Sequence, residues 1–200
     1  MDNGINRSAP LALFEYRRDR AVEYAKRWAL SRNPLFVDFA GVGGDCTNFV
    51  SQAILSGCCK MNDTPTFGWY YLSPDDRAPA WSGVDEFFNF MTGNGDFPPL
   101  LSRVGPIGYV TDRDYAAFGD VVQLSNRDGE FYHTLIITGN DGRGDILVSA
   151  HTNDALDRPL SSYPSVSERF IHIIGCLAPI DSPPSDCFMG LLNGTKATQE

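Results

Sequence analysis

The sequence lacks an apolar run long enough to cross a bilayer, and its basic residues are outnumbered by acidic ones. It has 16 Lys and Arg against 25 Asp and Glu, a net charge of −9. Binding to nucleic-acid phosphates requires a basic surface, so we expect neither a nucleic-acid nor a membrane partner. The N-terminus, MDNGINRSAPLALFEYRRDRAV, has no basic start followed by an uninterrupted apolar stretch. We therefore expect no signal peptide and a cytoplasmic chain as written, or a cell-wall location if an export signal was trimmed.

Residues that bind metals are also few. The three histidines are dispersed, and the adjacent Cys58 and Cys59 do not form a CxxC knuckle, so we expect no metal and no cofactor. The five cysteines, at positions 46, 58, 59, 176 and 187, leave at least one thiol unpaired in a monomer, the state we assume. This pattern favours a reducing compartment, while a disulfide between Cys176 and Cys187 stays open.

The composition itself is that of a globular protein. Apolar residues make up 42% and charged residues 20% of the 200-residue chain, which is enough to build one core. We expect a single domain over residues 13–178, with a flexible arm at 1–12 and a mobile, Pro- and Ser-rich tail at 179–200.

The stretch GGDCTNFVSQ, residues 43–52, is the most informative part of the chain. Two glycines free the backbone, and apolar residues then recur at helical spacing until Gly57. This pattern predicts a loop that becomes a helix, with Cys46 in its first turn. Free N–H groups and the helix dipole favour a thiolate there, and the same N–H groups can hold an oxyanion. A buried structural cysteine is the alternative interpretation.

The first half of the chain is predicted to be mainly helical. An amphipathic helix is expected over residues 13–30 and a short one over 84–91. The latter lies in a long irregular insertion, 60–106, of a kind that often shapes a binding site. Within the insertion, Trp81 either packs on the core or lines a cleft, and we assign it as a substrate-binding candidate.

The second half changes to a period of two, which indicates strands. Strands are expected at 119–124, 131–138, 145–151 and 167–177, with turns at SNRDG and NDGRG between the first three. Hairpin spacing makes the sheet antiparallel, so the fold class is α+β, with N-terminal helices packed on a C-terminal sheet.

Two histidines of this region are candidates for catalysis. His133 lies within the strand FYHTLIIT, and His151 ends the next strand, followed by Asn153. A hairpin can place His133 beside either group. Nucleophilic catalysis by a cysteine requires a base near the sulfur and a third group that orients the base. A hydrogen-bonded core histidine is the alternative for each.

The blocks GGDCTNFVSQ, GDVVQL, HTLIITG and ILVSAHTND together carry a family resemblance. In this order they resemble the bacterial putative amidase domain family, over roughly residues 16–175. They are similar, more distantly, to the NlpC-type and CHAP-type cysteine peptidases. The resemblance implies a papain-like cysteine peptidase fold, with Cys46 as nucleophile, His133 as base and acid, and His151 as the orienting residue.

The third role is open to more than one residue. The resemblance allows Asn153 as the alternative to His151, and Asp154 is also within reach in sequence. Asp45, which matches the family pattern, either caps the helix or helps to form the oxyanion site. His172 matches no motif and is expected to be structural.

These features predict a cysteine amidohydrolase or peptidase, a hydrolase that cleaves an amide bond in a peptide through an acyl-enzyme. A peptidoglycan-like cell-wall peptide is the expected substrate. An acyl transferase would use the same residues, and a catalytically silent peptide- or glycan-binding module is the alternative from another class. A redox role for the neighbouring Cys58 and Cys59 is disfavoured, since vicinal disulfides are strained.

Overall fold

The structure is a computed structural model that describes residues 9–195. The helices are α1 (Arg18–Trp28), α2 (Cys46–Cys58), α3 (Pro79–Ser82), α4 (Val84–Thr92) and α5 (Phe188–Asn193). The strands are β1 (Leu11–Phe14), β2 (Tyr71–Ser73), β3 (Asp76–Arg77), β4 (Gly105–Thr111), β5 (Val121–Ser125), β6 (Phe131–Asn140), β7 (Ile146–Ala150), β8 (Ala155–Pro159) and β9 (Glu168–Pro179). Short 3-10 turns lie at Leu100–Ser102, Arg113–Tyr115 and Leu160–Ser162.

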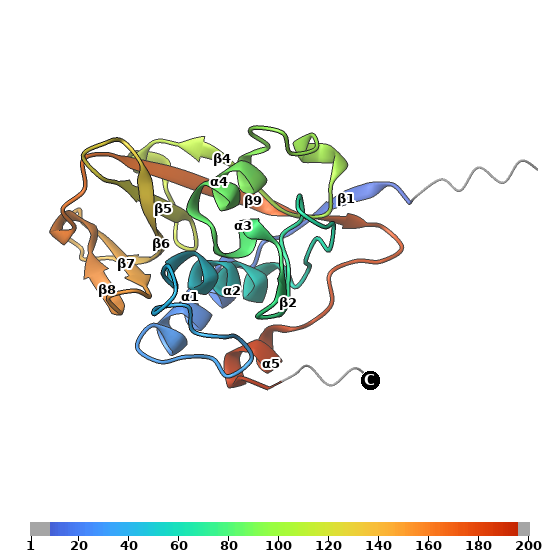
Figure 1. Cartoon of the computed structure of the whole chain (residues 1–200), viewed down its shortest axis with the longest axis horizontal. Coiled ribbons are helices and arrows are strands. Elements are labelled where there is room, and N and C mark those ends of the chain that lie inside the picture. The colour runs from blue at the N-terminus through green and yellow to red at the C-terminus, as the bar shows by residue number, and fades with distance from the viewer. Residues whose placement is uncertain (1–8, 196–200) are drawn as a thin grey trace, which may run out of the picture.

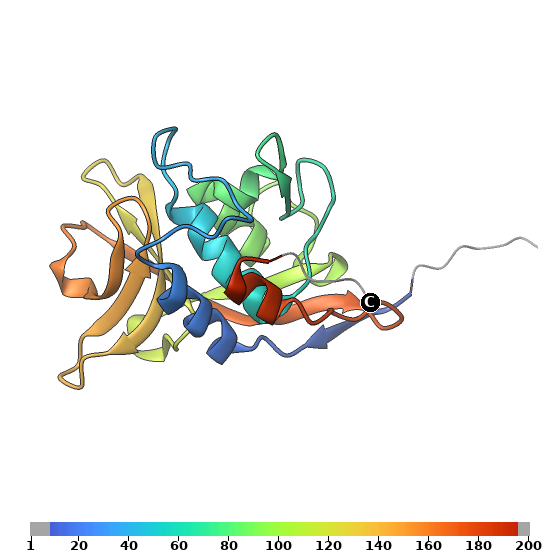
Figure 2. The same ribbon diagram turned by 90° about the horizontal axis from the view of Figure 1, so that it is seen from below.

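The main sheet is antiparallel and has seven strands in the order β1-β9-β5-β6-β7-β8, with β4 also paired to β9. Helices precede most of this sheet in sequence, so the expected α+β class is confirmed. In Figure 1 the strands β5 to β8 gather at the left of the molecule, and Figure 2 shows the same separation from below.

Helix α2 is buried on every side, which is typical of a helix in the centre of a core. It begins beside β6 and β7 and runs across the molecule toward β2 and α5 (Figures 1 and 2). Its apolar residues pack against α1, the insertion and one face of the sheet, while Leu124, Leu135 and Val148 belong to a second cluster. Neighbouring residues such as Leu135 and Ile136 fall in different clusters, so the two clusters lie on opposite faces of the sheet.

The N-terminal region differs from the expectation. Residues 11–14 form β1, which pairs with β9 from Leu11↔Pro179 to Phe14↔Cys176, and the helix begins only at Arg18. The prediction of a helix from residue 13 was therefore wrong, and residues 11 and 12 are not a flexible arm. Residues 1–8 of that predicted arm lie outside the described chain.

The C-terminal region is also more ordered than expected. Residues 188–193 form α5, and Cys187 forms a disulfide with Cys59, 128 residues earlier. Cys176 is a free, buried thiol, so the Cys176–Cys187 disulfide that the sequence left open does not form. The part of the predicted tail up to residue 195 is anchored to the end of α2, and 196–200 lie outside the described residues.

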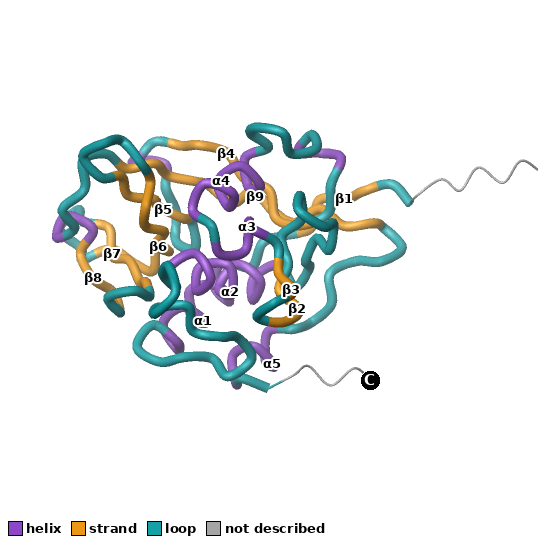
Figure 3. The backbone as a smooth tube through the Cα atoms, in the orientation of Figure 1, coloured by secondary structure: helices purple, strands orange, loops and turns teal. Residues whose placement is uncertain are grey.

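The insertion 60–106 contains more regular structure than its composition indicates. It holds β2, β3, α3 and the predicted helix α4, and its last residues begin β4. Figure 3 shows loops joining α1 to α2 and α2 to β2, with little regular structure in either. Within residues 9–195, no helix has both the length and the apolar character needed to span a membrane.

Candidate functional site

Cys46 is the first residue of α2, as the sequence predicts, and the preceding loop explains why the helix starts there. Gly43 and Gly44 have φ angles of 99° and 113°, which side-chain-bearing residues rarely adopt. The backbone N–H of Asp45 then donates to Thr152 Oγ1 at 2.6 Å. This bond ties the loop before the helix to the segment that follows β7.

Cys46 and His133 line one pocket of about 350 Å³ at this end of α2. The glycine loop forms one wall, and the strands β6 and β8 and the segments after β7 and β8 form the others. Among the hydrogen bonds of residues 9–195, none joins the Cys46 thiol to the His133 ring. The structure thus brings the two expected catalytic residues to the same pocket, with no hydrogen bond between them among the described residues.

Cys46 is 6% exposed, and this burial raises the pKa of its thiol. Backbone groups of Thr134, Thr47 and Cys46 itself oppose the rise by hydrogen bonding to the sulfur. The helix has no side-chain N-cap, so the N–H groups of its first turn keep no capping partner. The expected preference for a thiolate is therefore outweighed by burial, and the resting group is a neutral thiol.

His133 is 7% exposed and lies on β6. Burial, and secondarily the positive charge of Arg158, lowers the pKa of His133 to about 4. Its ring stacks on Tyr132 and lies tilted against Tyr163, each with a centroid distance of 6.0 Å. At neutral pH the imidazole is uncharged, which leaves a nitrogen lone pair to accept a proton.

His151 does not join this pocket. Its Nδ1 lies 2.6 Å from Asp45 Oδ2, and its Nε2 lies 2.9 Å from the carbonyl oxygen of Trp28. The ring is 1% exposed and stacks on Phe49 with a centroid distance of 4.0 Å. Both nitrogens face acceptors, so His151 has no free group with which to orient His133. Its expected role as third catalytic residue was wrong.

Asp45 is the partner that holds His151 to the nucleophile loop. Its Oδ1 accepts hydrogen bonds from the Phe39 N–H at 3.0 Å and from Asn48 Nδ2 at 2.7 Å. The carboxylate makes no capping bond to the helix backbone, so the capping interpretation was wrong. Three bonds from three segments instead fix the position of the residue directly before Cys46.

The other candidates for the third catalytic role lie in different surroundings. Asn153 lines the Cys46 pocket, while Asp154 accepts a bidentate pair of bonds from Arg32, both at 2.9 Å. Asn153 adopts a positive φ of 75°, which turns the chain back after β7. His172 lies on β9, where its Nδ1 is 2.8 Å from Asp120, and it does not line the pocket.

Trp81 belongs to the core. It has no exposed surface, and its indole Nε1 donates to Asn48 Oδ1 at 2.7 Å. Its ring packs against Trp69 and Phe36. The assignment of Trp81 as a substrate-binding residue was therefore wrong, and its contacts support the first turns of α2.

Two further residues of the pocket were not identified from the sequence. Arg158, on β8, stacks over the ring of Tyr163 at 4.1 Å and lowers the pKa of His133. The Tyr163 hydroxyl is buried and has no hydrogen-bond partner among the described residues. Neither residue lies in a recognisable motif. Arg158 reaches the site through the pairing of β8 with β7, and Tyr163 follows β8 along the chain.

Metal ligation finds no support at this site. Within residues 9–195, no three side chains of His, Cys, Asp or Glu come together in a group suited to a metal ion. The side-chain groups that the pocket offers are a thiol, an imidazole, an amide, a guanidinium, an aliphatic hydroxyl and two phenols.

Comparison with known proteins supports the family resemblance. Residues 15–174 match the family described as "Putative amidase domain". The chain is 28% identical over 170 residues to "Uncharacterized protein YhbB" of Bacillus subtilis (strain 168). The match covers 80% of this chain and 51% of that relative, so the chain spans about half of the relative's length. No solved structure matches.

Proposed function

The chain belongs to the amidase domain family that residues 15–174 match, and from this premise we propose that it is a cysteine-dependent amidase. The observation that supports this most directly is the presence of Cys46 and His133 on one pocket at the start of a buried helix. We further propose that the α+β fold is of the papain-like kind, in which a helix-start cysteine faces a histidine on the sheet.

In the proposed reaction, the substrate amide enters the pocket and the Cys46 thiol transfers its proton to neutral His133, directly or through one water. The sulfur then attacks the carbonyl carbon, and free N–H groups of the first helical turn hold the oxyanion. The C–N bond breaks as His133 returns the proton to the leaving amine. Water, deprotonated by His133, releases the acid from the thioester and restores the thiol.

Asn153 is the proposed third residue. It lines the same pocket, whereas His151 and Asp154 are held by other partners. An amide that donates or accepts one bond to an imidazole nitrogen selects the tautomer whose other nitrogen faces the sulfur. We expect this contact to form when substrate closes the pocket.

The proposed substrate is a peptide amide, and a cell-wall peptide fits two features. A second pocket of about 290 Å³ shares Gly43 and Gly44 with the Cys46 pocket and is lined by Arg77 and Glu86 of the insertion. The glycine loop thus lies between two sites that an extended chain can occupy. Arg158 offers a positive charge for a substrate carboxylate beside the nucleophile.

The disulfide bears on where the protein acts. Structural disulfides persist in oxidising environments, so Cys59–Cys187 supports a location outside the reducing cytoplasm, contrary to the expectation from cysteine number alone. A cell-wall substrate would be met in such a location.

The deciding experiment is mass spectrometry of the protein after incubation with purified peptidoglycan peptides. The proposal expects released amine and an acyl adduct on Cys46 in the wild type, and neither in Cys46→Ala. The control Cys176→Ala removes a buried thiol far from the pocket in sequence and should keep both. An acyl transferase would form the adduct but pass it to an added amine. Unchanged peptide binding by Cys46→Ala, with no adduct in the wild type, would favour the silent binding module.

A further inference from the structure

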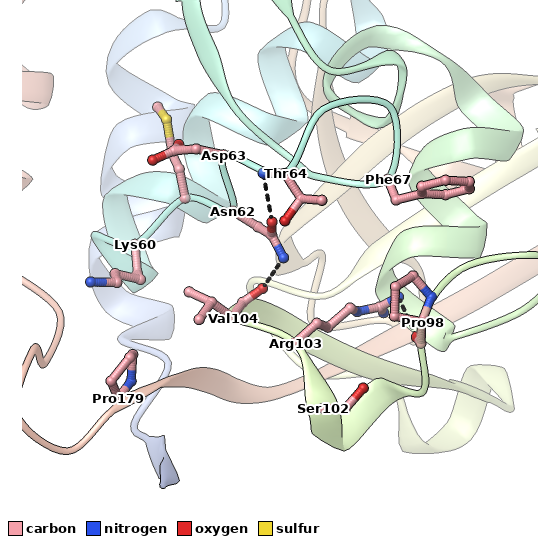
Figure 4. A pocket seen from close by; sticks show the side chains of 11 residues that line it. Lys60, Asn62, Asp63, Thr64, Phe67, Pro98, Ser102, Arg103, Val104 and Pro179 are labelled. Carbon is pink, nitrogen blue, oxygen red and sulfur yellow. Dashed lines mark hydrogen bonds between the residues drawn. The ribbon is translucent and has the colours of Figure 1, made fainter. Parts of the chain in front are cut away.

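A further pocket, larger than the one beside Cys46, lies at the opposite end of α2. Its volume is about 570 Å³, and its walls come from the loop that follows α2 and from the segment that leads into β4. Figure 4 shows Lys60, Asn62 and Thr64 on the first wall and Ser102, Arg103 and Val104 on the second. At 1.5 Å per residue, the 13-residue helix α2 separates it from Cys46 by roughly 20 Å.

The walls are joined by specific bonds. Asn62 Nδ2 donates to the carbonyl oxygen of Val104 at 2.8 Å, and the Thr64 N–H donates to Asn62 Oδ1 at 3.0 Å (Figure 4). Asn62 also pairs with Trp69 through the backbone in both directions. The pocket is therefore held by a fixed framework and does not depend on exposed side chains.

Arg103 is the unusual member of this pocket. It is 5% exposed, and its Nε and Nη2 are buried without a hydrogen-bond partner among residues 9–195. Its remaining terminal nitrogen, Nη1, donates only one long bond of 3.4 Å, to the carbonyl oxygen of Pro98. No salt bridge of the described chain includes Arg103. A buried cation that lacks an anion is costly, and protein interiors normally provide the partner.

Two aromatic rings hold the guanidinium in place. The Arg103 head lies over Phe90 at 4.3 Å and within 5.9 Å of Phe97. These contacts stabilise the face of the guanidinium group, but they leave the N–H groups at its edge without hydrogen-bond acceptors. Burial lowers the pKa of Arg103 to about 10, so it remains charged at neutral pH. In Figure 4 the side chain extends along the pocket wall toward Pro98.

We propose that this pocket binds a carboxylate on a small apolar molecule or peptide end, with Arg103 as its charged partner. The carboxylate replaces the long bond to Pro98 and accepts from the guanidinium edge, which suits its planar, two-oxygen shape. Phe67 and Val104 offer apolar contact to the rest of the ligand. Asp63 also lines the pocket, so a dianion such as phosphate would meet repulsion after one positive charge is neutralised.

Lys60 has a lesser role in this site. Its Nζ already donates to the Ser182 carbonyl at 3.1 Å and to the Ser182 hydroxyl at 3.2 Å, and the group is exposed to solvent. We expect it to attract the ligand to the entrance, where solvent weakens its contribution. The carboxylate-binding energy should therefore depend mainly on Arg103.

The test compares phenylacetate with its uncharged counterpart phenylacetamide, by ¹⁵N NMR titration of the full chain at constant ionic strength. Phenylacetate should shift the amide signals of Asn62, Thr64 and Val104 and bind at least about tenfold more tightly than phenylacetamide. Arg103→Met should abolish that difference. Arg143→Met removes the same charge from an exposed loop outside the pocket and should leave it unchanged.

Other outcomes would overturn the proposal. Equal binding of acid and amide, no binding of either, or shifts confined to residues around Cys46 would each show that Arg103 is only a structural cation packed on Phe90. Inorganic phosphate that binds more tightly than acetate would overturn the ligand class. If Arg103→Met does not fold, Arg103→Lys keeps the charge without the planar fork and should weaken phenylacetate binding about 10- to 100-fold.

Discussion

His133 lies on β6 and His151 directly follows β7, the next strand of the hairpin, yet their surroundings differ sharply. His133 forms part of a pocket wall, has no hydrogen-bond partner in the described chain, and has its pKa lowered to about 4. His151 is enclosed and uses both ring nitrogens, toward Asp45 and the Trp28 carbonyl. The residue with an unused lone pair faces the Cys46 pocket, and the fully bonded residue fixes the loop that carries Cys46.

This difference shows how a single hairpin can supply both a reactive group and a structural anchor. Satisfied buried networks stabilise one conformation, while an unpaired group in a pocket retains its chemistry for a ligand. The end of β7 explains the split. Pairing of β6 with β7 reaches Ile136 and Ser149 and β7 ends at Ala150, so His133 lies on a strand while His151 lies in the turn that follows.

The largest expected effect comes from His133→Gln. On the proposed mechanism it removes the proton acceptor, so kcat/KM for the peptide amide should fall about 10²- to 10⁴-fold. Because His133 makes no hydrogen bond, the free energy of unfolding at pH 7 should change by less than about 1 kcal/mol. Steady-state kinetics and urea unfolding measure the two quantities. His172→Gln is the histidine control, and an equal loss of activity there would contradict the assignment.

His151→Ala should mainly reduce stability, whereas His133→Gln should mainly reduce activity. It leaves the buried Asp45 carboxylate and the Trp28 carbonyl without their closest partner, so the free energy of unfolding should fall by about 3–5 kcal/mol. Urea unfolding at pH 7 measures this loss.

A double-mutant cycle with Asp45→Ala separates the pair from the cavity that each substitution leaves. If the two residues act together, the double variant should lose clearly less stability than the sum of the two single losses, since each single change already removes the pair. Additive losses would mean that His151 stabilises the protein through packing on Phe49 alone.

The pH dependence of stability tests whether His133 is desolvated in the folded protein. An unfolded histidine takes up a proton near pH 6.5, but folded His133 does so only near about 4. Between these values the unfolded state binds more protons, so stability falls as the pH falls and the loss is complete below about 4. The shift corresponds to roughly 3 kcal/mol.

His133→Gln lacks this group, so the difference in unfolding free energy between the wild type and the variant should change by roughly that amount from pH 7.5 to pH 4. The depressed pKa values of Asp145 and Asp154 affect both proteins alike and cancel in the difference. A constant difference across the range would show that His133 is not desolvated.

The sequence predicted those parts whose signals are local. The strands β5, β6, β7 and β9 and the helix α4 appear close to the expected positions, because alternation and helical spacing act over a few residues. The glycine loop and Cys46 at the helix start were likewise identified correctly. The common pocket of Cys46 and His133 followed from matching these elements to a family order.

The missed features depend on contacts between distant segments. Strand β1 exists because Leu11 to Phe14 pair with β9, and α5 is held by the Cys59–Cys187 disulfide, neither of which local composition shows. Burial outweighed the helix dipole at Cys46, and hydrogen bonds to Asp45 and the Trp28 carbonyl hold His151 outside the Cys46 pocket. Each of these outcomes needed knowledge of which atoms pack together in three dimensions.

Arg158 offers the smallest but most selective test of the His133 environment. Its positive charge is the second cause, after burial, of the lowered pKa of His133. Arg158→Gln should therefore raise that pKa only in part, because the ring stays desolvated. An NMR titration of the His133 ring should show the midpoint move upward and remain below 6.5, while the Arg143→Gln control leaves it unchanged. A midpoint that reaches 6.5 in Arg158→Gln would show that charge, and not burial, keeps His133 neutral, and that the pocket is wetter than its geometry indicates.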